Sequence, residues 1–155
     1  MLFMGTEKYP DENYYSKFIQ SHAGSSNAAT SEDYTYYYFE IKNEAFPEAV
    51  DIYSQFFKNP LFTDSATDRE MNAVDSEFRK NLSSDSRRLS QVEKSFIARK
   101  GSVLNRFSTG NLETLKVKGI RDYLLKFHLD HYSSNLMSLC MVGNHSLDRL
   151  EEIAV

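Results

Sequence analysis

No run of apolar residues in this sequence is long enough to cross a membrane, and the chain has one cysteine and no tryptophan. A membrane-spanning helix needs about 20 mostly apolar residues, so we expect no membrane partner. Cys140 cannot form a disulfide within the chain, and a lone cysteine is typical of a reducing compartment. These features favour a cytoplasmic protein, with a mitochondrial location as the alternative.

The charge excludes a further class of partner. The 18 basic and 22 acidic residues give a net charge of −4, and Lys and Arg form no stripe along the sequence. Nucleic-acid-binding domains carry a basic patch, so we expect no nucleic-acid partner. The chain is instead rich in aromatic residues, with 10 Tyr and 11 Phe. Tyrosine suits a surface that is half apolar and half wet, such as a cleft or a contact face.

Both ends of the sequence look cut. The chain opens on an apolar run with no capping residue before it. It closes inside an amphipathic helix that Ser146 would cap at its start, and no cap follows. We therefore expect residues 1–155 to be a partial domain that is truncated at both ends.

The spacing of apolar residues predicts an α+β fold. Residues 25–42 predict two strands, and the apolar run 136–142 predicts a third, buried strand in which Cys140 is an inert core residue. Helices are predicted over residues 10–24, 44–58, 64–81, 85–99 and 119–131. In the second helix, Phe46, Val50, Tyr53 and Phe57 follow helical spacing. We expect an antiparallel-type sheet with helices packed on one face.

Two glutamates in the third predicted helix, Glu70 and Glu77, are the first candidates for chemistry. Seven residues make almost two full turns, so both side chains lie on one face, roughly 10 Å apart along the helix axis. Two carboxylates so far apart do not easily bind one metal ion together. One could be a ligand while the other supports the site or the substrate, or both could belong to a solvated acidic face.

Several long motifs occur in an order that resembles one family. They are MLFMGTEKYPDEN (1–13), HAGSSNAATSEDYTYYYFE (22–40), DREMNAVDSEFRKN (68–81), FSTGNLETL (107–115) and LLKFHLDHYSSNLM (124–137). Together they resemble the N-terminal catalytic domain of the pitrilysin and insulin-degrading enzyme family of zinc metallopeptidases. The resemblance implies an endopeptidase that hydrolyses peptides small enough to enter an enclosed chamber, with a homo-oligomer in the full-length protein. The alternative is a non-catalytic paralogue that binds or scaffolds.

The resemblance implies a zinc cofactor and assigns the two glutamates. The family carries an H-x-x-E-H motif, in which two histidines bind zinc and the glutamate acts as the base. That motif would immediately precede Met1, and no H-x-x-E-H occurs in this chain. Glu77 matches the third zinc ligand of the family, and Glu70 matches its supporting acidic residue. A zinc ion needs several converging ligands, so we expect this chain alone to be inactive.

The resemblance also implies a substrate-binding strand at residues 24–30. In the family a peptide adds to this strand as a further strand, and Asn27, Ala28 and Ala29 match residues that contact it. On the sequence alone these residues could equally form a polar turn. The insulin-degrading type of this family has a large aromatic residue where this chain has Ala29, which leaves the size preference of the pocket open. Phe3 resembles an aromatic residue of the specificity pocket, with a plain core residue as the alternative.

Histidines offer a second, weaker metal hypothesis. His128 and His131 are three residues apart on a predicted helix and could share a face as ligands. The resemblance gives them no such role, and a structural role is the alternative. His22 lies at the end of a predicted helix, where a cation is favourable, and we interpret it as structural.

Overall fold

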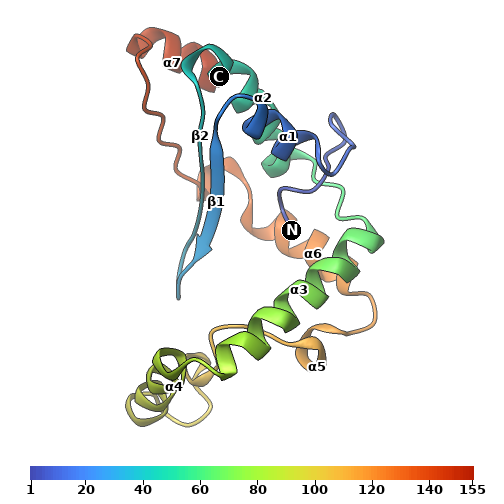
Figure 1. Cartoon of the computed structure of the whole chain (residues 1–155), viewed down its shortest axis with the longest axis vertical. Helices are drawn as coiled ribbons and strands as arrows, with labels where there is room; N and C mark the ends of the chain where they lie inside the picture. Colours follow the sequence, from blue (N-terminus) through green and yellow to red (C-terminus); the bar gives the residue numbers. More distant parts are fainter. The chain divides into compact units, whose positions relative to one another are not determined.

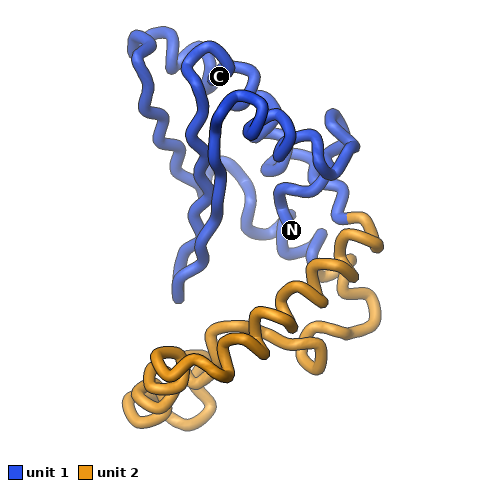
Figure 2. Tube along the Cα trace, viewed as in Figure 1, with its two compact units in different colours: residues 1–62, 124–155 blue, residues 63–123 orange.

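The computed structural model describes all 155 residues, and the chain folds as two compact units. Unit 1 comprises residues 1–62 and 124–155, and unit 2 comprises residues 63–123 (Figure 2). The two strands and the first two helices belong to unit 1 (Figure 1). None of the helices is long and apolar enough to cross a membrane.

Unit 1 is built around a β-hairpin. Strand β1 (Ser25–Thr30) pairs antiparallel with β2 (Thr35–Glu40), in a register that sets Asn27 opposite Tyr38 and Ala29 opposite Tyr36. The aromatic and β-branched residues of β2 suit a strand. The sheet has these two strands only, so the outer side of β1 has no strand partner in this chain. The two strands predicted within residues 25–42 are confirmed.

Helices α1 (Tyr14–Ser21) and α2 (Phe46–Lys58) cover one face of the hairpin. A short 3-10 turn, η1 (Asn43–Ala45), leads into α2. The shared core consists of Leu2, Tyr15, Ile19, Ala49, Ile52, Phe56 and Phe62. Tyr37 and Phe39 of β2 pack against this core from the sheet side, while the tyrosines that alternate with them are exposed. The predicted α+β class, with helices on one face of an antiparallel sheet, is confirmed.

The spaced apolar residues of α2, Phe46, Val50, Tyr53 and Phe57, form a stripe one position away from its most buried residues. The fully buried residues of α2 are Ala49, Ile52 and Phe56, whereas this stripe is only half-buried. That stripe faces the hairpin instead of the centre of the core: the ring centroid of Tyr53 lies 4.9 Å from that of Phe39. Because α2 has apolar partners on two sides, its hydrophobic pattern is wider than a single stripe.

The turn between α1 and β1 depends on a close approach of backbones. The N–H of Gly24 donates to the carbonyl of Ile19 at 2.8 Å, and Ala23 takes the left-handed conformation at φ 52°. A Cβ on Gly24 would lie 2.4 Å from the carbonyl oxygen of Glu40. Glycine is therefore required here because β2 passes too close for any side chain.

Unit 2 is helical. It contains α3 (Asp64–Leu82), α4 (Asp85–Ile97), the 3-10 turn η2 (Val103–Asn105) and α5 (Leu112–Leu115). Helix α3 begins after Thr63, whose hydroxyl accepts the N–H of Ala66 at 3.3 Å, as an N-cap residue does. The helices predicted from residues 64 and 85 are thus confirmed. Helix α6 (Ile120–His131) begins in unit 2 and continues into unit 1, and it confirms the helix predicted over residues 119–131.

The predicted third strand is wrong. Residues 137–142 follow the 3-10 turn η3 (Ser134–Leu136) as an extended segment without strand pairing, before α7 (Leu147–Ala154). Leu139 is 67% exposed and Val142 86% exposed, and Cys140 is exposed as well, so it is no inert core residue. A buried strand needs neighbours that use its backbone hydrogen bonds, and an apolar composition does not supply them.

Candidate functional site

The two candidate glutamates lie on α3 in unit 2. Glu70 is half-buried and Glu77 is exposed. Since both belong to one continuous helix, their seven-residue spacing keeps them on one face, roughly 10 Å apart along the axis. The prediction that one helix carries both glutamates is confirmed. Their roles in zinc binding and catalysis remain predictions.

Asp75, a carboxylate between these two, was missed by sequence reasoning. It is 8% exposed, and its Oδ2 accepts a hydrogen bond from Arg79 Nε at 2.8 Å. Its Oδ1 accepts the backbone N–H of Leu112 at 3.0 Å, which ties α5 to α3. The Asp-x-x-x-Arg spacing was the available signal, because residues four apart are neighbours on a helix. Asp75 therefore fixes the structure around the glutamates.

The residues of this chain do not by themselves make a zinc site. No group of three or more His, Cys, Asp or Glu side chains converges in a way that could hold a metal ion. Zinc sites in proteins use three or four such ligands. The carboxylate of Glu77 is exposed, and its role as a zinc ligand stays a prediction.

The histidines of α6 pack against aromatic rings. The His128 ring stacks on Tyr132 with centroids 4.9 Å apart, and burial lowers the pKa of His128. The ring of His131 lies 4.6 Å from that of Phe127. At the end of α1, His22 Nδ1 lies 2.9 Å from the carbonyl oxygen of Phe18. These contacts agree with structural roles for all three histidines.

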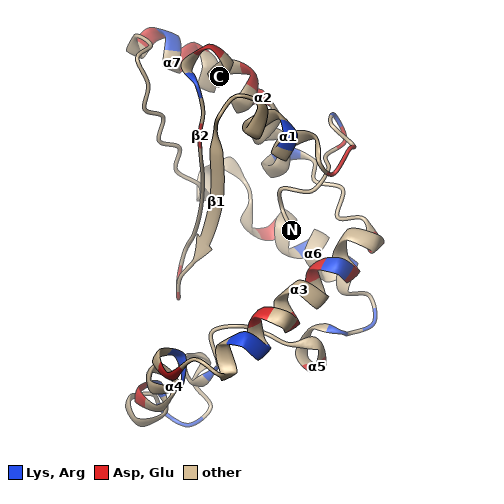
Figure 3. Ribbon diagram, in the orientation of Figure 1, with Lys and Arg blue, Asp and Glu red and all other residues tan.

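The candidate substrate residues of β1 alternate between the two faces of the hairpin. Asn27 and Ala29 are exposed, and Ala28 is half-buried on the inner face. The amide oxygen of Asn27 accepts the backbone N–H of Ala28 at 2.8 Å. Figure 3 shows that β1 carries no charged residue, and that the acidic residues of the hairpin lie at its turn and its far end. A peptide lying along β1 would therefore meet mainly backbone groups and small side chains.

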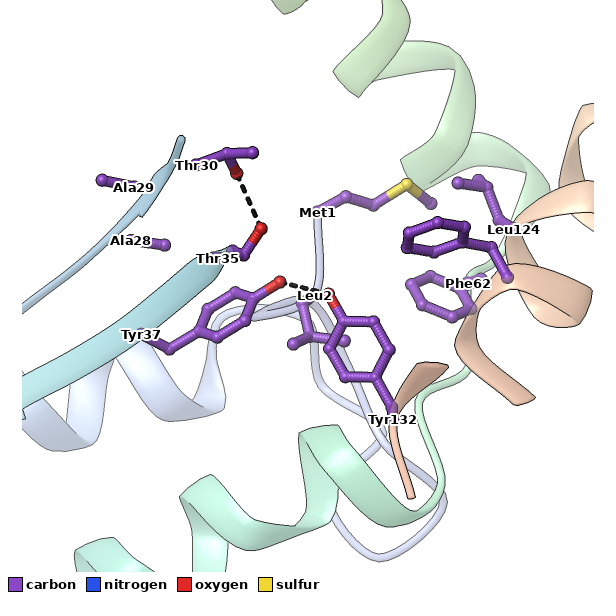
Figure 4. Close-up of a pocket in the computed structure, with 11 residues that line it drawn as sticks. Met1, Leu2, Ala28, Ala29, Thr30, Thr35, Tyr37, Phe62, Leu124 and Tyr132 are labelled. Atoms are coloured by element: carbon purple, nitrogen blue, oxygen red, sulfur yellow. Dashed lines mark hydrogen bonds between the residues drawn. The ribbon is translucent and has the colours of Figure 1, made fainter. Parts of the chain in front are cut away.

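A cavity of about 340 Å³ opens in unit 1 beside the inner face of β1. Figure 4 shows the hydroxyl groups of Tyr37 and Tyr132 meeting on one side of it, 2.5 Å apart, with apolar side chains on the other. Its lining comprises Met1, Leu2, Ala28, Ala29, Thr30, Thr35, Tyr37, Phe62, Leu124, Phe127 and Tyr132. Of the predicted substrate residues, Ala28 and Ala29 line this cavity, while Asn27 does not.

Phe3 lies in an aromatic cluster of unit 1. Its ring centroid is 5.3 Å from that of Tyr15, 5.4 Å from Phe56 and 5.7 Å from Tyr37. Such distances are typical of packed aromatic pairs in a core. The contacts agree with the core alternative, and a role of Phe3 in substrate binding stays a prediction.

Comparisons with known proteins agree with the motifs. The family model described as Insulinase (Peptidase family M16) matches residues 1–100. The insulin-degrading enzyme of Homo sapiens is 48% identical over 161 residues, covering 100% of this chain, and the A-factor-processing enzyme of Saccharomyces cerevisiae is 48% identical over 158 residues, covering 98% of it. The chain spans only 16% and 15% of the lengths of these two relatives.

The fold matches as well. The crystal structure of pitrilysin superimposes with a TM-score of 0.90 at 35% sequence identity, over 99% of this chain and 17% of that one. The resemblance inferred from the ordered motifs is thereby confirmed. With a family match over residues 1–100 and 48% identity over its whole length to family members, the chain belongs to the insulinase family of peptidases, M16.

Proposed function

We propose that this chain is part of a zinc-dependent metalloendopeptidase that hydrolyses peptides. The observation that carries the proposal is the outer edge of β1, which has no strand partner and is lined by small, uncharged residues. An extended peptide can add to such an edge through main-chain hydrogen bonds, which gives affinity with little dependence on sequence. By their names, one relative degrades insulin and another processes A-factor.

The backbone groups available to a peptide follow from the hairpin register. At the turn, the N–H of Ser31 donates to the carbonyl of Tyr34 at 2.8 Å. In an antiparallel ladder the hydrogen-bonded pairs alternate, so Ala29 and Asn27 also point their backbone groups toward β2. Ser26, Ala28 and Thr30 therefore point theirs outward. We propose that a bound peptide pairs with the backbone groups of these three residues. The side chains of Asn27, Ala28 and Ala29 would then lie nearest to the peptide.

The proposed metal centre uses Glu77 as one zinc ligand and Glu70 as a supporting carboxylate. Both are on one face of α3, which is the arrangement that this assignment needs. The remaining ligands would come from an H-x-x-E-H motif outside the 155 residues. When bound, the metal supplies Lewis-acid chemistry at the substrate carbonyl and the attacking water.

Zinc titration tests this assignment. We expect the 155-residue chain to bind Zn²⁺ no better than an ordinary carboxylate surface in isothermal titration, because it offers too few converging ligands. A longer polypeptide that includes H-x-x-E-H immediately before Met1 should bind one Zn²⁺ tightly. In that longer protein, Glu77→Gln should weaken zinc binding about 10-fold or more, because one of three protein ligands loses its charge.

Each result has a distinct meaning. Tight one-to-one binding by the 155-residue chain would point to a different site, with His128 and His131 to be substituted first. If Glu77→Gln leaves the zinc affinity of the longer protein unchanged, Glu77 is not a zinc ligand. A gene whose sequence upstream of Met1 encodes no H-x-x-E-H would instead indicate a non-catalytic binding or scaffold subunit.

We further propose a cytoplasmic location for the whole protein. An exposed, unpaired thiol at Cys140 is compatible with a reducing compartment. A relative from Arabidopsis thaliana is named as peroxisomal, so location varies within the family. Fluorescence microscopy of the tagged full-length protein tests this location.

We also propose that the full-length protein forms a homo-oligomer. Analytical ultracentrifugation of that protein tests this proposal.

A further inference from the structure

The outward-facing edge of β1 is already partly occupied, by a side chain of the same strand. Of the three residues that point their backbone groups outward, Ala28 is the central one. Its N–H is the donor of a 2.8 Å hydrogen bond to Oδ1 of Asn27. The backbone groups of Ala28 point outward because Ser31 and Tyr34 form a hydrogen-bonded pair at the turn, and hydrogen-bonded pairs alternate along an antiparallel ladder.

A second contact supports this register independently. The hydroxyl oxygens of Thr30 and Thr35 lie 3.1 Å apart, across the last pair of the ladder. Side chains approach most closely in pairs that do not exchange backbone hydrogen bonds, so Thr30 belongs to the outward-facing set. Ala28, two residues away, belongs to the same set. The Asn27 amide therefore sits on the free edge of the sheet and not between the strands.

The amide oxygen of Asn27 imitates the group that an added strand would bring. A carboxamide oxygen and a backbone carbonyl oxygen are the same kind of acceptor. A peptide that pairs with β1 needs the N–H of Ala28 for one of its own carbonyls. It cannot form that bond while Oδ1 of Asn27 holds the donor. Asparagine is also a poor strand former, so its presence in the strand is explained better by this bond than by strand propensity.

We propose that Asn27 is a positioning residue that caps the central N–H of the β1 edge, and that a bound peptide strand displaces it. This inference rests on the proposed addition of substrate to β1. In the absence of peptide, the capped donor makes the edge a poorer template for pairing with a second copy of the chain. When peptide binds, the Asn27 amide is released from Ala28 and becomes free to contact the peptide.

Amide hydrogen exchange in the 155-residue chain tests the cap without any ligand. In Asn27→Ala we expect the amide of Ala28 to exchange about five-fold faster, as loss of one exposed hydrogen bond implies. The amide of Ala29 should be unchanged because it faces β2. Asn27→Asp keeps an acceptor oxygen and should protect Ala28 at least as well as the wild-type chain. Equal exchange at Ala28 in the wild type and in Asn27→Ala would overturn the cap.

Peptide titration by NMR then tests the displacement. The probe is a capped six-residue peptide of alternating valine and threonine, which favours an extended strand. If the peptide must displace Asn27, Asn27→Ala should bind it about five-fold more tightly and Asn27→Asp no more tightly than the wild type. The matched control is Asn72→Ala, since Asn72 is an exposed asparagine of α3 whose amide bonds its own helix. It should leave the affinity unchanged.

The outcomes separate this inference from the function on which it rests. If the peptide binds the wild type and Asn27→Ala equally, strand addition stands and the displacement is wrong. Weaker binding by Asn27→Ala would mean that Asn27 serves as a direct contact and not as a cap. If no variant binds the peptide at millimolar concentration, both the displacement and the proposed strand addition fail, even where faster exchange confirms the cap itself.

Discussion

The two units of this chain bury different kinds of residue. In unit 1 most buried side chains are aromatic or aliphatic, with Ile52 at 1% and Phe56 at 2% exposure. In unit 2 the buried positions of α3 are small or polar, and α4 has no buried residue at all. Phe96 and Ile97 at the end of α4 are 86% and 85% exposed. The hydrophobic core cluster of the chain consists entirely of residues of unit 1.

The two groups of candidate residues belong to different units. The strand assigned to the substrate belongs to the unit with the core, where a rigid backbone edge can be maintained. The two glutamates lie on α3, which is supported by the Thr63 cap, the contacts of Asp75 and the packing of Phe78 against Phe107 with ring centroids 5.3 Å apart. Helices in proteins gain most of their stability from packing an apolar face. The buried residues of α3 are Ala66, Thr67, Asp75 and Asn81, and α4 has none.

The largest expected difference between the two units appears when one phenylalanine in each is replaced by alanine. Phe56→Ala should lower the free energy of unfolding of unit 1 by about 3–5 kcal/mol, because it removes a buried ring and leaves a cavity. Phe96→Ala, at an exposed ring of the same kind, should change the free energy of unfolding by less than about 0.5 kcal/mol. Urea titration followed by NMR signals assigned to each unit measures both effects.

Similar losses from both substitutions would contradict the difference between the units. A large effect of Phe96→Ala would mean that α4 packs against something in solution, such as a second copy of the chain. Sedimentation at several protein concentrations would then reveal that association.

Alkaline pH should weaken unit 1 through its buried phenols. Burial raises the pKa of Tyr15 to about 12, and it also raises the pKa of Tyr37 and of Tyr53. An unfolded tyrosine titrates near pH 10, so between about pH 10 and 12 the folded state holds protons that the unfolded state has lost. The free energy of unfolding therefore falls as pH rises through this window, and the full contribution is present only below about pH 10.

Urea unfolding at pH 9 and pH 11 measures this effect. We expect a loss of roughly 1 kcal/mol from Tyr15 alone, after an allowance for solvent screening. Tyr15→Phe should remove that part of the pH dependence while it keeps the ring in the core. A pH dependence that is the same in Tyr15→Phe as in the wild type would show that other groups cause the loss.

The local elements of this fold were accessible from the sequence. Helix spacing, the Ser146 cap and the aromatic run of β2 each identify their element without knowledge of the rest of the chain. The segment 136–142 was predicted wrongly because its composition is that of a buried strand, whereas burial depends on neighbouring strands. The same limit applies to α2, whose second apolar surface appears only once the hairpin is in place.

The candidate site shows the same division. The spacing of Glu70 and Glu77 within one helix could be read from the sequence, because helical geometry is local. The hydrogen bond from the backbone N–H of Leu112 to the carboxylate of Asp75 could not, because 37 residues separate them. The bond between Asn27 and Ala28 joins adjacent residues, but its meaning depends on which way Ala28 points, and this is fixed by the hairpin register.

The smallest expected effect concerns Glu77, and it is informative because it is small. Glu77→Gln should change the free energy of unfolding of the 155-residue chain by less than about 0.5 kcal/mol, since the side chain is exposed. The matched control is Asp75→Ala on the same helix, which should cost about 1–3 kcal/mol because it leaves Leu112 N–H without its acceptor. Chemical denaturation measures both. If Glu77→Gln is as costly as Asp75→Ala, Glu77 has a structural role in unit 2, and the case for it as a metal ligand is weaker. If it is silent, its carboxylate is available for the zinc ligation that we propose.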